Sequence, residues 1–83
     1  MFSIDWHPNV RRFLRKLPAN TSKRVVNKLK EIRENPFRYL EHFEGKKYYK
    51  LCIGDYRVLI DVDFKRKILF VQVLDKRGRI YKR

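Results

Sequence analysis

Two cations lie inside residues 48–62, YYKLCIGDYRVLIDV, a segment that otherwise alternates like a β-hairpin. The Gly-Asp pair at 54–55 predicts a tight turn with a positive φ at the glycine. Every second residue of a strand shares a face, so Lys50 and Arg57 are expected on the face opposite the apolar residues. Opposed strands lie about 5 Å apart, so these cations can be close neighbours, at a cost in stability that a bound polyanion would remove. The pattern fits a phosphate site, and it fits equally well a solvated basic face on a basic protein.

Other residues could carry chemistry, but for each a structural explanation is favoured. Asp61 and Asp63 share a strand face, as metal-binding carboxylates can, but no third ligand is apparent. Cys52 could be a nucleophile, but no base is placed beside it, and a small, partly covered side chain is the better interpretation. His7 opens a helix and His42 lies in a loop, which favours structural or surface roles. The sequence predicts neither a metal nor a cofactor.

Charge is the strongest compositional signal. The chain of 83 residues has 22 Lys and Arg against nine Asp and Glu, a net charge of +13. Solubility requires a net charge of only about 2–8 in a small domain, so the excess indicates a polyanionic partner. RNA, DNA, an anionic membrane face and an acidic protein are all candidates, and nucleic acid is favoured.

Length and motifs restrict the class of protein further. Residues 1–83 are expected to form one domain, which at this size buries about 60% of its unfolded surface. A single cysteine excludes an internal disulfide and a cysteine-based zinc site. No apolar run is long enough to cross a bilayer, and the first ten residues lack the order of a signal peptide. A cytoplasmic protein with no membrane partner is therefore expected.

The elements that must position these residues follow from the periodicity. Residues 2–6 alternate as a strand, and Pro8 suits the first turn of a helix that Pro18 ends. A second helix is expected to take its N-cap from the segment 20–22 and to stop at residues 35–36. Two apolar stripes at helical spacing define the buried faces: Val10, Phe13, Leu14 and Leu17, then Val25, Val26, Leu29 and Ile32.

After residue 45 the period changes from 3.6 to 2. Residues 36–45 read as a connection with buried anchors at Leu40 and Phe43. Four strands are then expected, at 47–53, 56–63, 67–74 and 79–82. The third is almost wholly apolar, which predicts a central strand covered on both faces. This order predicts an α+β fold, a small, largely antiparallel sheet of about four strands with an N-terminal strand and a two-helix hairpin packed on one face.

Nearly the whole chain resembles a RelE-type toxin of the RelE/ParE toxin–antitoxin superfamily. The resemblance rests on the helical hairpin ending in ENP, on FEGKKYYKLCIGDYRVLIDVD and on the terminal VLDKRGRIYKR. It implies a fold similar to that of compact microbial ribonucleases. It also implies entry into the ribosomal A site, cleavage of mRNA there, and a cognate RelB-like antitoxin that silences the toxin in a complex that can be hetero-oligomeric.

The same resemblance implies the site residues. Lys50 and Arg57 match residues that act at the scissile phosphate, Arg77 matches an arginine after the last long strand, and Tyr81 matches a tyrosine that stacks on the base or assists proton transfer. Cys52 stands where well-studied members have a second lysine. The residues expected to bind RNA around this centre are Lys46, Lys47, Lys76, Arg79 and Lys82.

In such a site, cations would stabilise the charge that develops on the phosphate during metal-independent attack by the 2′-OH. Neighbouring cations would also help Lys50 to act as a general base. The ribosome would hold the mRNA in an attack geometry, so free RNA should be cut poorly. Two alternatives stay open: a ParE-like inhibitor of DNA gyrase, and an RNA-binding member with weak or no cleavage.

Overall fold

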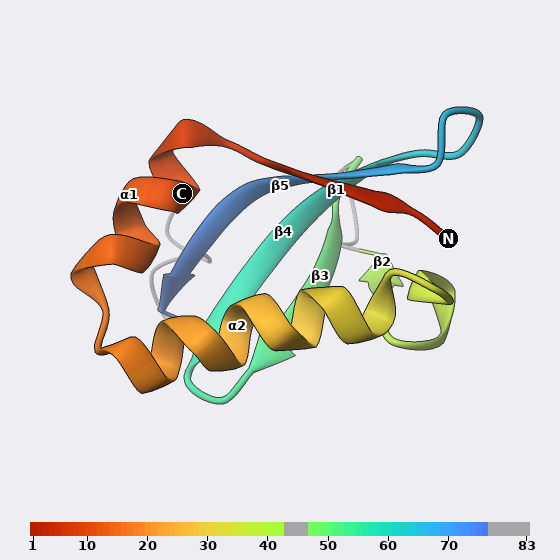
Figure 1. The fold of residues 1–83 in the computed structure, drawn as a ribbon. Coiled ribbons are helices and arrows are strands. Elements are labelled where there is room, and N and C mark those ends of the chain that lie inside the picture. The colour runs from red at the N-terminus through yellow and green to blue at the C-terminus, as the bar shows by residue number, and fades with distance from the viewer. Residues whose placement is uncertain (43–46, 77–83) are drawn as a thin grey trace.

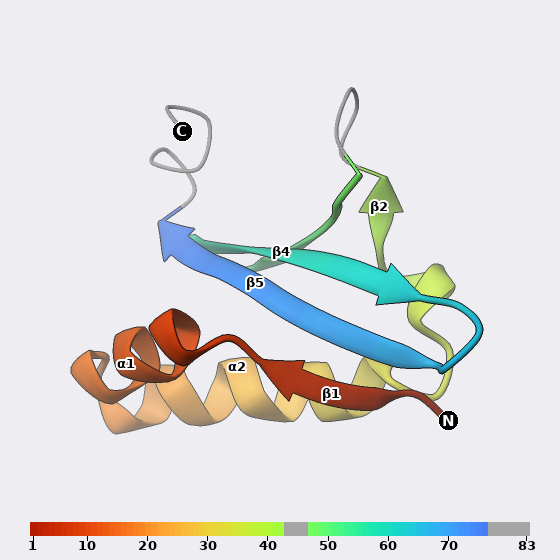
Figure 2. The same cartoon turned by 90° about the horizontal axis from the view of Figure 1, so that it is seen from above.

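The computed structural model describes residues 1–42 and 47–76. Both helices lie on one side of a curved sheet (Figures 1 and 2). Phe43, Lys46, Arg77, Arg79, Tyr81, Lys82 and the strand expected at 79–82 lie outside the described residues. The elements, in chain order, are β1 (Ser3–Trp6), α1 (Pro8–Lys16), α2 (Ala19–Ile32), the 3₁₀ helix η1 (Pro36–Arg38), β2 (Glu41–His42), β3 (Tyr49–Ile53), β4 (Tyr56–Asp63) and β5 (Ile68–Lys76).

The strands form one mixed sheet in the order β1-β5-β4-β3-β2. β1 runs parallel to β5, and the other three pairings are antiparallel. The predicted α+β class is thus confirmed, with the N-terminal strand at one edge of the sheet and the two-residue β2 at the other edge. β2 lies within residues 36–45, which were expected to form a connection. The sequence did not predict this strand, because two residues are too few to show a period.

A β-bulge interrupts the pairing of β5 with β4. Leu59 lies opposite Val73 while Ile60 lies opposite Val71, so Gln72 is the extra residue on β5. The bulge keeps the apolar residues of β5 on the helix side although their spacing is irregular. β5 is an interior strand, as expected, but several residues on its other face are only half buried, so it is not covered on both faces.

The helix boundaries follow from the prolines. Pro8 is the first residue of α1, and the Nδ1 of His7 accepts a hydrogen bond from the backbone N–H of Asn9 at 3.0 Å. His7 therefore has the structural role that was expected. α2 starts at Ala19 with Pro18 at the N-cap and no side-chain cap, so the N-cap expected within residues 20–22 is wrong. Pro18 starts the helix early, and Ser22 Oγ instead donates to the carbonyl of Leu14.

The core lies between the helices and the sheet. All residues of the two predicted stripes except the half-buried Val26 pack in or against it from the helix side, and Leu40, at 8% exposed, is buried as expected. Alternation on β3 and β4 is also confirmed, since every expected core position of the hairpin packs in or against this cluster. The buried cluster comprises Val10, Val25, Leu29, Ile32, Leu40, Leu51, Ile53, Val58, Ile60, Leu69, Val71 and Leu74.

Candidate nucleic-acid interface

Lys50 and Arg57 occupy the sheet face that points away from the helices. Their chain neighbours Leu51 and Val58 belong to the core, and successive side chains of a strand point to opposite faces. We call this surface the open face. The hairpin carries both cations there because the turn at Gly54, with φ +57°, fixes the register of β3 on β4.

The register makes the two cations diagonal neighbours. Lys50 lies opposite Leu59, and Arg57 lies opposite Cys52. Diagonal positions on adjacent strands are about 7–8 Å apart, within reach of long side chains. The cations therefore share one surface without facing each other directly.

Carboxylates accompany these cations. Lys50 Nζ lies 3.6 Å from Glu41 Oε2 on β2, and Asp75 on β5 is directly opposite Arg57 on β4. Asp75 also accepts a hydrogen bond from the backbone N–H of Lys76 at 2.7 Å. The ion pair with Glu41 thus offsets the charge of Lys50, and Asp75 places a carboxylate at the strand position that faces Arg57. Neither carboxylate is part of the predicted site. Asp75 was missed because the apolar pattern ends the third expected strand at residue 74, whereas β5 extends to Lys76. Glu41 falls in the segment that was expected to be a connection.

The two cations differ in how far they are buried. Arg57 is 3% exposed and Asp75 is 5% exposed, whereas the side chain of Lys50 is 26% exposed. Lys50 can therefore meet a phosphate in the present conformation, while Arg57 can do so only if the groups that cover it move. Alternation in the sequence predicts which face a residue occupies, and it contains no information on what covers that face.

The other described RNA-binding candidates, Lys47 and Lys76, are exposed, but only Lys47 lies beside this face. Lys47 precedes β3, and its side chain is 70% exposed, with Nζ 3.6 Å from Asp61 Oδ2. Lys76 ends β5 and is exposed, but it lies opposite Tyr56, which packs against the core, so alternation places it on the helix side of the sheet. The described part of the predicted site therefore consists of accessible lysines around a buried arginine.

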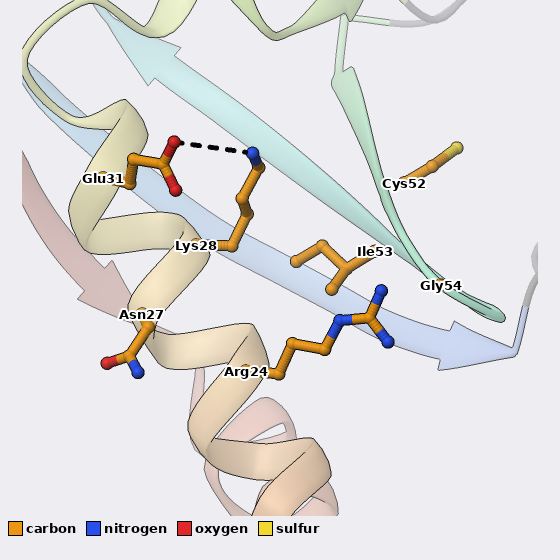
Figure 3. Close-up of a pocket in the computed structure, with 7 residues that line it drawn as sticks. All are labelled: Arg24, Asn27, Lys28, Glu31, Cys52, Ile53 and Gly54. Carbon is orange, nitrogen blue, oxygen red and sulfur yellow. Dashed lines mark ion pairs between the residues drawn. The ribbon is translucent and has the colours of Figure 1, made fainter.

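Cys52 is exposed, so the expectation of a partly covered thiol is wrong. It lies on the short segment of β3 that precedes the turn, beside a cavity of about 460 Å³ between α2 and this turn. Figure 3 shows the guanidinium of Arg24 reaching towards Gly54, while the side chain of Cys52 points away from that of Ile53. Four polar side chains of α2 line the helix side of the cavity: Arg24, Asn27, Lys28 and Glu31.

The remaining candidates have structural partners. Asp61 pairs with Lys47, and Asp63 accepts a hydrogen bond from the backbone N–H of Arg66 at 2.9 Å. His42 lies in β2, not in a loop, and its ring meets Tyr49 edge-on at 5.3 Å. Across residues 1–42 and 47–76, no cluster of three or more His, Cys, Asp or Glu side chains is arranged to hold a metal. In the same ranges, every helix is too short or too polar to cross a membrane.

A two-helix layer on a small mixed sheet is the architecture of the RelE/ParE superfamily of toxins. A family model described as the ParE toxin of the type II toxin–antitoxin system, parDE, matches residues 4–81. The chain therefore belongs to the ParE toxin family of type II toxin–antitoxin systems. A comparison with curated protein sequences found no match.

Solved structures agree with this fold. The RelE–RelB complex from Pyrococcus horikoshii matches with a TM-score of 0.80 and 26% identity over 94% of this chain and 97% of that one. The toxin–antitoxin complex RelBE2 from Mycobacterium tuberculosis gives a TM-score of 0.80 and 23% identity, covering 92% and 98% of the two chains. A free-state mutant of Escherichia coli RelE gives 0.76 and 21% identity, covering 98% and 90%.

Proposed function

We propose that this toxin is a ribosome-dependent endoribonuclease that cleaves mRNA in the A site and thereby inhibits translation. The observation that carries the proposal is the position of Lys50, which is accessible on the open face and lies diagonal to Arg57. RNA would approach this face, attracted by a net charge of +13. The protein would act in the cytoplasm, where translation takes place.

The proposed chemistry divides the work among four residues. Lys50 places a cation beside the scissile phosphate as negative charge develops on it. Arg57, with Arg77 from the C-terminal segment, adds positive potential, and Tyr81 stacks on the base or assists proton transfer. Lys47 and Lys76, with Lys46, Arg79 and Lys82, hold the flanking RNA backbone. The ribosome supplies the alignment of the 2′-OH with the phosphate.

Glu41 fits this proposal as the carboxylate that forms an ion pair with Lys50 before RNA binds. A phosphate that replaces the carboxylate at 3.6 Å keeps the lysine paired throughout binding. Cys52, which stands where well-studied members have a second lysine, leaves Lys50 as the cation of β3 on this part of the open face. Lys47 supplies a further exposed cation just before the strand.

A RelB-like antitoxin is the partner that we propose for the silent state. The solved structures similar to this chain include toxin–antitoxin complexes from Pyrococcus horikoshii and Mycobacterium tuberculosis. An acidic segment laid over the basic surface would compete with RNA for the same cations. Such a complex would be a hetero-oligomer.

The test of the proposed activity is to map the ends of cellular mRNA after brief induction of the toxin. New ends within codons of translated messages are expected, and they should disappear with Lys50→Ala or Arg77→Ala. Lys30→Ala, which removes an exposed lysine from α2 on the other side of the sheet, is the matched control and should leave the cuts unchanged. Unaltered cleavage in both site variants would show that the site is misassigned.

Inhibition of DNA gyrase is the second candidate, because the matching family model describes ParE toxins. The same induced cells distinguish the two activities. Gyrase-linked DNA breaks with intact mRNA would replace the ribonuclease proposal. Salt-sensitive RNA binding with neither cuts nor breaks would identify a binding protein without cleavage.

A further inference from the structure

An exposed pair of stacked aromatic rings lies outside the site described above. Phe37 follows the start of η1, and Phe64 lies in the turn between β4 and β5. Their ring centroids are 5.3 Å apart and their planes differ by 7°. They are nevertheless 46% and 56% exposed. Because a small domain gains stability by burying large apolar rings, a rigid pair left in water indicates a binding function.

The pair is fixed from beneath by two further rings. Phe2 meets Phe37 edge-on at 6.0 Å, and Tyr49 meets Phe37 at 6.2 Å and Phe64 at 6.5 Å. Phe2 and Tyr49 in turn pack against the core. We call Phe37 and Phe64, with these two supporting rings, the aromatic platform. More than half of Phe64 is open to solvent, so a further planar ring can extend the stack.

Cations surround the platform. Lys65, Arg66 and Lys67 directly follow Phe64, Arg38 directly follows Phe37, and all four are exposed. Asp63 lies 3.9 Å from Arg66 Nε and offsets part of this charge. Exposed rings among exposed cations form the surface that nucleic acids with unpaired bases require, since bases stack on the rings and phosphates lie near the cations.

The supporting rings of the platform lie on the side of the sheet opposite Lys50. Tyr49 packs on the helix side of the sheet, whereas Lys50 lies on the other side. Figure 2 shows η1 and the β4–β5 turn at one end of the molecule, opposite the end where β5 finishes. Asp63, which precedes Phe64, lies opposite Ile68 at the start of β5, whereas Arg57 lies opposite Asp75 near its end. Seven residue steps at about 3.3 Å correspond to roughly 23 Å between these two positions. Lys50 is nearer, since it directly follows Tyr49, and Phe64 lines a cavity together with Asp61 and Phe70.

We propose that the aromatic platform binds unpaired bases of RNA, with one base stacked on Phe64 and the neighbouring phosphates beside Lys65 and Lys67. Only the choice of RNA as the ligand rests on the proposed function. Binding itself needs neither cleavage nor the residues of the open face. The platform would give the toxin a second, sequence-tolerant contact with unpaired RNA, because every base has a face that can stack.

The test measures binding of a fluorescent single-stranded 2′-O-methyl RNA, which cannot be cleaved through its 2′ position, across a series of salt concentrations. Phe37→Ala with Phe64→Ala should weaken binding by about ten-fold or more at every salt concentration, as loss of base stacking does. Phe64→Trp should bind at least as well as the native chain. Tyr39→Ala is the matched control, because Tyr39 is also exposed but lies over Lys28, and it should bind normally.

The salt dependence separates stacking from charge. The phenylalanine variants should keep the native slope of log affinity against log salt, whereas Lys65→Gln with Lys67→Gln should reduce the slope by about one for each phosphate that is no longer neutralised. Circular dichroism and thermal melts confirm folding, and Phe64→Leu preserves apolar packing while removing the ring. Native RNA binding by well-folded Phe64→Leu and by the double alanine variant would overturn the proposal. If the phenylalanine variants bind RNA normally but bind the antitoxin more weakly, the platform binds a protein partner and the proposal is overturned.

Because the RNA is uncleavable, the binding assay tests the platform alone, and its result does not depend on whether the toxin cleaves mRNA. A chain that cuts no mRNA but loses RNA affinity with the platform supports the platform and contradicts the proposed activity. A chain that cuts mRNA and binds RNA equally well without the platform supports only the activity.

Discussion

Arg57 is the residue at which stability and function are most closely joined. Its side chain is buried directly opposite the equally buried Asp75. We propose that these two buried opposite charges at facing strand positions interact. Removing one member of such a pair costs about 3–5 kcal/mol, because the other charge stays out of water. We expect Arg57→Met to lower the free energy of unfolding by roughly that amount, as measured by urea denaturation.

A double variant separates the two roles of Arg57. Arg57→Met with Asp75→Leu removes both charges, so most of the lost stability should return. If Arg57 acts on RNA, the double variant should still fail to cut mRNA although it is stably folded. Additive losses of stability in the two single variants would show that the two side chains are not coupled.

Glu41 should tune the affinity of Lys50 for phosphate. The two charged atoms are 3.6 Å apart, and the Glu41 side chain is 76% exposed. Because exposed pairs contribute at most about 1 kcal/mol, Glu41→Gln should hardly change stability, yet it should raise RNA affinity about two- to five-fold. The gain should be largest at low salt in binding to uncleavable RNA. Glu31→Gln on α2, which removes the partner of Lys28, is the control expected to have no effect.

At the scale of the element, the β3–β4 hairpin depends on one glycine. Gly54 has φ +57°, and a Cβ there would lie 3.0 Å from Arg24 Nη1. The arginine tip can move aside, so the backbone conformation sets the cost. We expect Gly54→Ala to destabilise the chain by about 1–2 kcal/mol in urea denaturation. Gly54→Asn should cost less, since asparagine tolerates this region better, and equal costs would contradict a conformational origin.

The elements themselves were largely predictable from the sequence. Helix stripes, prolines and the glycine turn are local signals, and each one fixed a boundary to within a few residues. The bulge at Gln72 was not predictable, because it follows from how two strands of unequal spacing match each other. β2 and the Pro18 cap were not predicted either, because the local sequence contains no clear signal for them. A two-residue strand has no period, and residues typical of caps occupied the first turn instead.

The candidate site was predictable in part. Alternation placed Lys50 and Arg57 on one face, but the direct opposition of Arg57 to Cys52 depends on register. The burial of Arg57 depends on groups distant in sequence. The aromatic platform joins residues 27 positions apart in the chain, so no local pattern predicts it.

At the scale of the whole molecule, the excess of positive charge works against the compact fold of the isolated chain. The chain carries +13 within a fold whose Cα radius of gyration is 12.0 Å. Glu41, Asp61 and Asp63 each pair with a cation on or near the sheet, and Asp75 lies opposite Arg57, so the excess is positive over the remaining surface. An acidic antitoxin or RNA would each relieve this repulsion, which explains why both should compete for one surface.

Salt should therefore stabilise the isolated toxin. The screening length is about 30 Å at 0.01 M and about 10 Å at 0.1 M ionic strength, and the molecule measures 34 × 26 × 22 Å. Almost all of its cations repel one another at the lower concentration, and only close neighbours do so at the higher one. We expect the Tm to rise by several degrees between 10 and 150 mM NaCl, since about 1 kcal/mol corresponds to roughly 4–8 °C in a domain of this size. Lys23→Glu with Lys30→Glu, at two exposed positions of α2, should flatten this rise by lowering the net charge from +13 to +9. The antitoxin complex should lose the rise altogether, because salt then also weakens the charge pairing between the partners. A Tm of the isolated chain that does not depend on salt would contradict self-repulsion as a feature of this fold.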